Sequence, residues 1–270
     1  DERLTAQMLG EMRVTAGIGG ADITTLVNTH ANGDHTFGNR LVERAEIIAS
    51  QAGADEMAEV PPQMLAELMA QAPQMGALGQ YLQQAFGAFD FDGVRLTTPT
   101  RTFTGSMDLT VGDKTVHLIE VGPAHTRGDT LVHLPSDRLI YTGDILFIEG
   151  TPIMWAGPVG NWLDACDRIL AMDVDTIVPG HGPVTDKQGV QRVRDYLAYI
   201  DREARRRYEA GLSVEDAARD IALGDFANWG DAERIAVNVD TLYREYAGDT
   251  SPPDIMRLFT LMAQLSQDKR

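Results

Sequence analysis

The chain is poor in several features, and each absence narrows its function. Cysteine occurs once, at Cys166, so no disulfide can form within the chain, which favours a reducing, cytoplasmic location. Basic residues are few: 23 Lys and Arg stand against 40 Asp and Glu, a formal net charge of -17. Such a charge repels a phosphate backbone, so we expect no nucleic acid as a partner. No apolar run approaches the roughly 18 residues of a membrane helix, so we also expect no membrane partner.

The composition is that of a globular protein, and its helical and β patterns together predict an α/β chain. The 270 residues are 43% hydrophobic, enough to bury a sizeable core in one large domain or a domain with an appendage. The apolar spacing predicts an amphipathic helix over 2–17, and β-branched residues predict a buried strand over Ile23 to His30. A short helix over 36–45 and a strand over 46–50 are expected to follow.

In the middle of the chain the residue pattern changes from one typical of helices to one typical of strands. Residues 51–88, rich in Ala, Met, Leu and Gln, predict two or three short helices, and we treat about 51–90 as a helical insertion. Residues 101–144 predict hairpins with turns at Gly112-Asp113 and Ser136-Asp137. A helix over 162–172 and a buried strand ending at His181 should then complete the first predicted domain, residues 1–185.

The remainder of the sequence, residues 186–270, is predicted to be a helical extension that packs on that domain. Its acidic start at Ser213 is typical of a helix N-terminus. The expected helices are 190–210, 213–223, 232–246 and 254–265. Apolar residues of this tail can either cover the domain or form a homodimer.

Histidine and aspartate gather where predicted strands end. The stretch THANGDHT contains His30, Asp34 and His35, and His125, Asp144 and His181 each follow a later strand beside a glycine. Singly, each is more simply a turn former or a capped histidine. Zinc, however, usually takes four such ligands, and six at strand ends together favour a metal site. His117 and His133, inside β segments, and the mid-helix Cys166 are assigned to structure.

Taken in order, THANGDH, GPAHTRGD, YTGD and PGHGP resemble the successive metal motifs of the metallo-β-lactamase-fold hydrolases. The resemblance implies an αββα sandwich with a dinuclear centre at one edge, a helical tail following it. One metal would take His30, the residue at 32 and His125, the other would take Asp34, His35 and His181, and Asp144 would bridge them.

Two departures from the family pattern affect this interpretation. Asn32 occupies the position of the second histidine of His-x-His-x-Asp-His. An amide oxygen is a weaker zinc ligand than imidazole, so the first site should be weakened or shifted towards manganese or iron, leaving one or two zinc ions per chain. Few strands precede His30, so we expect a sandwich short of N-terminal strands, through truncation, genuine variation or strand sharing with a partner.

The leading hypothesis is a metal-dependent hydrolase of an acyl bond, namely an ester, thioester, lactone, amide or β-lactam, in a small and fairly apolar substrate. Metal-activated water would be the nucleophile, and Asp34 would orient it or carry its proton. Met154, Trp155 and Trp162, in a loop rich in Gly and Pro, would bind the substrate, although core packing is the alternative. A metal-dependent oxidoreductase and a metal-impaired binding domain remain alternatives.

Overall fold

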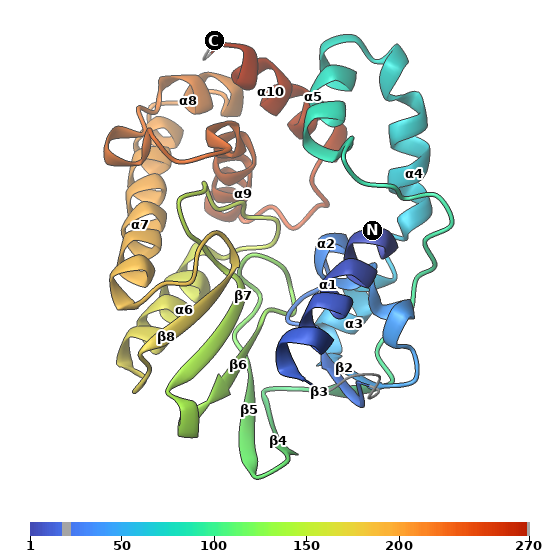
Figure 1. Cartoon of the computed structure of the whole chain (residues 1–270). Helices are drawn as coiled ribbons and strands as arrows, with labels where there is room; N and C mark the ends of the chain where they lie inside the picture. Colours follow the sequence, from blue (N-terminus) through green and yellow to red (C-terminus); the bar gives the residue numbers. More distant parts are fainter. Residues whose placement is uncertain (18–22, 269–270) are drawn as a thin grey trace. The chain divides into compact units, whose positions relative to one another are not determined.

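The computed structural model describes residues 1–17 and 23–268 of the chain (Figure 1). The chain divides into two compact units, Asp1–Thr104 and Gly105–Arg270, which are described separately. Each unit contains a β-sheet and helices, as expected for an α/β chain.

The sheet of the first unit is parallel. Its strands are β1 (Thr25–Val27), β2 (Glu46–Ser50) and β3 (Arg101–Phe103), in the order β1-β2-β3. Strand β2 lies in the middle, and its Ile47 and Ile48 are fully buried, as the apolar EIIAS stretch predicts. Strand β1 is shorter than the predicted 23–30, because after the bond from Asn28 N to Ile48 O the chain turns away from the sheet.

Helices occupy the connections of this unit. α1 (Glu2–Ala16) begins at Asp1, which caps Leu4 N, and ends at Gly17, whose φ of 64° favours glycine. The predicted helix over 36–45 is wrong: α2 spans Gly33–Thr36, and a 3₁₀ helix, η1, spans Asn39–Val42. The short helices predicted between β2 and β3 are present: they are α3 (Gln51–Met57), α4 (Pro62–Gln71), the 3₁₀ helix η2 (Ala72–Gln74) and α5 (Gly76–Phe86).

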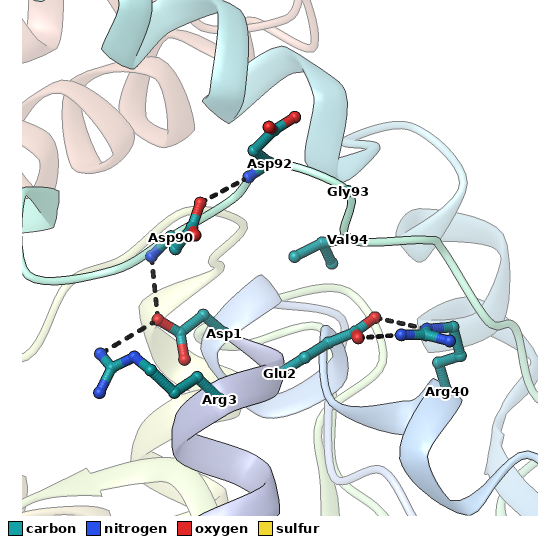
Figure 2. A pocket seen from close by; sticks show the side chains of 8 residues that line it. All are labelled: Asp1, Glu2, Arg3, Arg40, Asp90, Asp92, Gly93 and Val94. Atoms are coloured by element: carbon teal, nitrogen blue, oxygen red, sulfur yellow. Dashed lines mark hydrogen bonds and ion pairs between the residues drawn. The ribbon is translucent and has the colours of Figure 1, made fainter.

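A polar hollow of about 300 Å³ lies at the start of α1 (Figure 2). Two of its carboxylates are already bound: Asp1 accepts a hydrogen bond from the backbone N–H of Asp90 at 2.9 Å, and Glu2 pairs with the guanidinium of Arg40. The hydrogen bond from Arg40 lowers the pKa of the Glu2 carboxyl below its ordinary value. The hollow therefore serves to join α1 to η1 and to the segment after α5.

The sheet of the second unit is antiparallel over its first four strands. They are β4 (Ser106–Val111), β5 (Lys114–Glu120), β6 (Thr130–Leu134) and β7 (Leu139–Phe147). The predicted turn at Gly112-Asp113 is confirmed, with Gly112 at a φ of 64° between paired residues Val111 and Lys114. β8 (Thr176–His181) joins β7 in parallel, after the crossover helix α6 (Val159–Ala171).

Strand β7 contains an irregularity that the sequence did not predict. We expected the strand to end at Asp144, but it continues to Phe147. Between Gly143 and Phe147 it advances four residues while β8 advances only two, from Pro179 to His181. Asp144 therefore lies in a bulge, where the extra length of chain re-aims its side chain, rather than at a strand end.

Helices follow His181, as predicted. They are α7 (Lys187–Glu209), α8 (Val214–Asp220), α9 (Ile235–Ala247) and α10 (Ile255–Asp268), with 3₁₀ helices η4 (Gly224–Phe226) and η5 (Ala232–Arg234) between α8 and α9. The Ser213 side chain caps α8 by accepting from Asp216 N. α7 packs against α6 and α9 within this unit. The domain boundary at 185/186 stays a prediction.

Over residues 1–17 and 23–268, no helix combines the length and the apolar character that crossing a membrane requires.

Candidate metal centre

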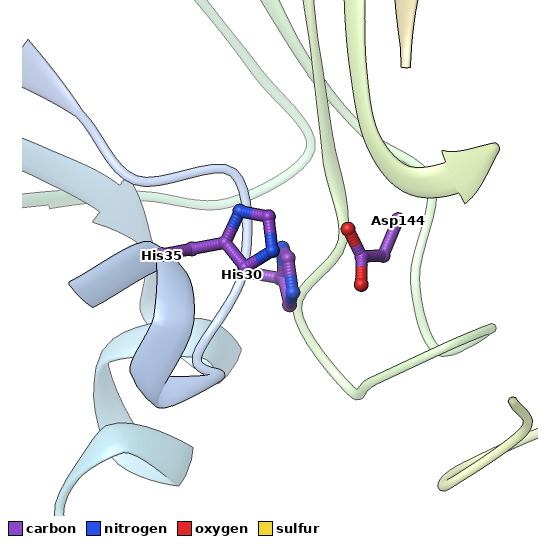
Figure 3. Close-up of side chains that lie close together, drawn as sticks. All are labelled: His30, His35 and Asp144. Carbon is purple, nitrogen blue, oxygen red and sulfur yellow. The ribbon is translucent and has the colours of Figure 1, made fainter. Parts of the chain in front are cut away.

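The loop after β1 in the first unit contains the first group of predicted ligands. His30 and His35 lie side by side, with ring centroids 4.3 Å apart (Figure 3). Asp34 Oδ2 is 3.2 Å from His35 Nε2. The structure therefore brings the three predicted ligands of this loop together, within a few residues of chain. Each side chain offers an atom of the kind that divalent metals bind.

Asn32 stands at the N-cap of α2, between these ligands. Its side chain makes no capping hydrogen bond, and instead its backbone oxygen accepts from His35 N and Thr36 Oγ1, each at 3.0 Å. The backbone of Asn32 thus holds the turn of the loop, and its side chain has no part in that cap.

A pair of buried amides fixes this loop to the rest of the first unit. Asn28 and Asn39 exchange side-chain hydrogen bonds of 3.1 and 2.9 Å. Asn28 also donates to His35 O at 3.2 Å, and Asn39 donates to Thr97 O at 3.0 Å. Because buried amides need all of these partners, the pair holds the backbone at His35 in one position. The sequence prediction missed both residues; for Asn28, an asparagine directly after strand β1 was the available signal.

The second group of predicted ligands converges within the second unit. Asp144 Oδ2 lies 3.3 Å from His125 Nε2 and 3.2 Å from His181 Nε2. The side chains of His125 and Asp144 are buried, whereas that of His181 is 40% exposed. A single carboxylate oxygen thus faces two imidazole nitrogens, so these three side chains could contribute ligands to a metal.

The orientation of His125 is set by the backbone. Its Nδ1 lies 2.6 Å from the carbonyl oxygen of Ile153, and a carbonyl can only accept, so Nδ1 is the protonated nitrogen. In the neutral ring the lone pair is then on Nε2, the nitrogen that points at Asp144. Metal-binding histidines in proteins commonly donate a hydrogen bond from their second ring nitrogen in this way, which fixes the tautomer and the orientation of the ring.

Glycine and phenylalanine complete the surroundings of Asp144 and His181. A Cβ at Gly180 would lie 1.9 Å from Asp144 Oδ1 and 2.7 Å from the backbone carbon of Gly143. Only glycine therefore lets β8 approach the Asp144 carboxylate so closely. The ring of Phe147 stacks on His181, with centroids 4.9 Å apart and planes inclined by 9°.

The loop that contains His125 is closed by Asp129. The Asp129 carboxylate accepts from Thr126 N at 2.9 Å and from Thr126 Oγ1 at 2.8 Å, and both residues are buried. These two hydrogen bonds lie within the HTRGD part of the motif and stabilise the turn next to His125. The sequence analysis did not single out Asp129 or Phe147. The acidic residue that ends GPAHTRGD was an available signal for Asp129, whereas no motif marks Phe147.

The residues assigned to structure are accommodated as expected. Cys166 is fully buried on α6, and burial raises the pKa of its thiol to about 12, so it stays protonated. His117 and His133 are cross-strand neighbours on β5 and β6, and His117 Nδ1 lies 2.6 Å from Asp108 Oδ1. Burial and the neighbouring His117 lower the pKa of His133.

Met154, Trp155 and Trp162 were predicted to bind the substrate, and that role stays a prediction. Met154 and Trp162 are fully buried, and Trp162 Nε1 donates to Ile145 O at 2.9 Å. Trp155 is partly exposed and lies against Phe259, with ring centroids 6.3 Å apart. Of the three, only Trp155 offers surface to a substrate without rearrangement.

A known protein family matches the part of the chain that contains the predicted ligands. The model of the Metallo-beta-lactamase superfamily matches residues 6–181, which include every predicted ligand. The chain belongs to the metallo-beta-lactamase superfamily. The 2,4-dinitroanisole O-demethylase subunit alpha of Nocardioides sp. (strain JS1661) is 28% identical over 147 residues, 52% of this chain and 36% of that protein.

Two solved structures show the same fold. A stereoselective inverting sec-alkylsulfatase from Pseudomonas sp. matches with a TM-score of 0.61 and 16% identity, over 88% of this chain and 43% of that chain. A metallo-beta-lactamase from Pontibacter korlensis matches with a TM-score of 0.51 and 17% identity, over 72% of this chain and 76% of that one. The expected family and the α/β sandwich fold class are thereby confirmed. The chain spans less than half the length of the demethylase subunit and of the alkylsulfatase.

Proposed function

We propose that this chain carries the catalytic domain of a metal-dependent hydrolase. In this proposal one or two divalent ions, zinc in the first instance, are held by the predicted ligands His30, Asn32, Asp34, His35, His125, Asp144 and His181. The observation that carries the proposal is the single Asp144 oxygen that faces both His125 Nε2 and His181 Nε2. Membership of the superfamily and the order of the four motifs support it.

The donor set fits a divalent ion with nitrogen and carboxylate ligands. In the neutral ring of His125 the lone pair is on Nε2 because Nδ1 donates to Ile153 O, and Gly180 leaves room for the Asp144 carboxylate. Both features are outer support of the kind that a metal ligand needs.

A bound divalent metal would supply Lewis acidity, which polarises a carbonyl group and lowers the pKa of water. The chain's own contribution would come from Asp34, whose side chain is 53% exposed beside His35. Its carboxylate would accept a proton from the attacking water and return it to the leaving group. In ester hydrolysis, the water oxygen bonds to the carbonyl carbon, and the bond from that carbon to the alcohol oxygen breaks.

For the substrate, we propose an acyl bond in a small, fairly apolar molecule. The net charge of -17 disfavours polyanions. Arg234, whose guanidinium carbon lies 5.4 Å from the centroid of the Phe147 ring, is already paired with Asp231 and donates to Thr151 O. The demethylase relative acts, by its name, on an aryl methyl ether, so 2,4-dinitroanisole belongs in a substrate test as the second candidate.

The test is a metal analysis followed by a substrate panel. Protein purified without added metal is analysed for zinc, manganese and iron, and then assayed with a neutral ester, a thioester, a lactone, a cephalosporin, 2,4-dinitroanisole and a secondary alkyl sulfate. Bound zinc with turnover of the ester, thioester, lactone or cephalosporin supports the proposal. Bound iron without hydrolysis points to redox chemistry, and a chain that binds no metal overturns the proposal.

Asn32→His should strengthen the first of the two metal positions. Imidazole nitrogen binds zinc more tightly than an amide oxygen, so we expect more zinc per chain and an affinity at least about 10-fold higher at that position. Zinc content and competitive chelator titration measure this. The matched control is Gln80→His, which adds a histidine at an exposed position of α5. Equal zinc binding by the two variants would contradict a weakened first position.

A further inference from the structure

One face of α9 and η5 binds the backbone of the loop that follows β7. Four polar side chains at helical spacing each contact this loop between residues 151 and 159: Arg234, Asn238, Thr241 and Glu245. Spacings of four, three and four residues place them on one stripe of the helix. The helix therefore holds the loop through its polar groups and not only by apolar packing.

Asn238 is central to this contact. It is 1% exposed, accepts from Met154 N at 2.9 Å and donates to Pro152 O at 2.9 Å. Its second amide hydrogen is directed to Tyr196 Oη, also at 2.9 Å. Next along the stripe, Thr241 Oγ1 donates to Met154 O at 2.6 Å. These bonds hold the peptide groups on both sides of Ile153.

Residues 153–156 of this loop form three hydrogen bonds with His125. The carbonyl of Ile153 accepts from His125 Nδ1, and the N–H groups of Trp155 and Ala156 donate to His125 O at 3.0 and 3.1 Å. The position of Ile153 between two anchored residues thus determines both the ring tautomer and the backbone of a predicted metal ligand. A shift of this carbonyl would release Nδ1 and leave the ring free to turn.

Apolar packing of the helix does not by itself explain these four polar side chains. Buried amides and hydroxyls cost more than aliphatic side chains unless every group is bonded, so a helix that only packed would be expected to carry apolar residues here. Instead, the polar groups of Asn238 and Thr241 meet the backbone on either side of the one carbonyl that orients His125. That placement connects the helical extension to the metal ligand.

We propose that Asn238, with Thr241, is a positioning residue: through the loop of residues 152–154 it holds the Ile153 carbonyl against His125 Nδ1 and so presents Nε2 for a metal. The metal part of this inference rests on the proposed function. The orientation of His125 does not, and it can be measured in the chain without metal.

The experiment compares Asn238→Ala with Tyr196→Phe. Both remove part of the same buried network, but Tyr196→Phe leaves the two contacts of Asn238 with the loop intact. Tm, the ¹⁵N NMR signals of the His125 ring in the metal-free chain, and the Co²⁺ dissociation constant by chelator competition are recorded for each. For Asn238→Ala we expect loss of the slowly exchanging Nδ1–H signal and Co²⁺ binding weakened about 10-fold. For Tyr196→Phe, only Tm should fall.

A second pair of variants covers the case in which Asn238→Ala fails to fold. Thr241→Val keeps the shape of the side chain and removes the bond to Met154 O, whereas Thr241→Ser restores the hydroxyl. Weaker Co²⁺ binding in Thr241→Val and recovery in Thr241→Ser would support the proposal. If the variants lower Tm while the His125 signals stay as in the wild type, positioning is refuted. If the wild type binds no Co²⁺, the proposed function fails, and the ring signals still decide the positioning.

Discussion

Asp144→Asn should lose most of its bound metal while keeping its fold. The amide has the same shape as the carboxylate, and its NH₂ group can donate to the lone pairs of His125 and His181, so the bulge of β7 is expected to persist. A neutral amide, however, is a poor replacement for a carboxylate between two metal positions. Since changes in outer-shell residues already cost 10–100-fold in metal affinity, we expect losing this ligand to cost more than about 100-fold.

Metal content after gel filtration, and chelator competition, measure the effect of Asp144→Asn. Asp164→Asn is the matched control, because it neutralises an exposed carboxylate on α6. Hydrolysis of any substrate identified in the panel should fall in parallel with metal content in Asp144→Asn and stay unchanged in the control. Retention of wild-type metal content by Asp144→Asn would show that Asp144 is not a ligand.

Gly180→Ala should disturb both stability and metal binding. The added Cβ would lie 1.9 Å from Asp144 Oδ1, 2.7 Å from Gly143 C and 2.9 Å from Asp144 N. Since two of these atoms belong to the backbone of β7, rotation of the Asp144 side chain alone cannot relieve the overlap. Overpacking of this kind typically costs about 1–3 kcal/mol of unfolding free energy. The displaced carboxylate should also weaken metal binding at least about 10-fold.

Gly160→Ala provides the comparison for Gly180→Ala. Gly160 lies in α6, and a Cβ there would meet nothing within 4 Å. Alanine at a helical position should raise the unfolding free energy by about 0.5–1 kcal/mol. Urea unfolding of the metal-free chains separates the two variants. If both glycine substitutions change the unfolding free energy in the same direction, the close approach of β8 to β7 at Gly180 is not important for stability.

The helices and strands were predictable wherever apolar spacing was regular. The helix over 2–17, the strand EIIAS and the helices after His181 all follow from local pattern and caps, and each is present. The failures lie beside the ligands. The helix predicted over 36–45 became α2 and η1, and the strand predicted to end at Asp144 runs on to Phe147. In both places the backbone follows contacts with distant residues rather than local propensity.

By itself, the sequence determined the class of protein and the chemical types of the candidate ligands, because motifs and their order are properties of the chain alone. It also identified Asn32 as the position that departs from the pattern. Tertiary structure alone decided how the ligands are held: Asn28 with Asn39 at the first loop, Ile153 O at His125 Nδ1, and Gly180 against Asp144. These contacts join residues far apart in sequence, and hydrogen bonds and steric limits between such residues leave no periodic trace in the chain.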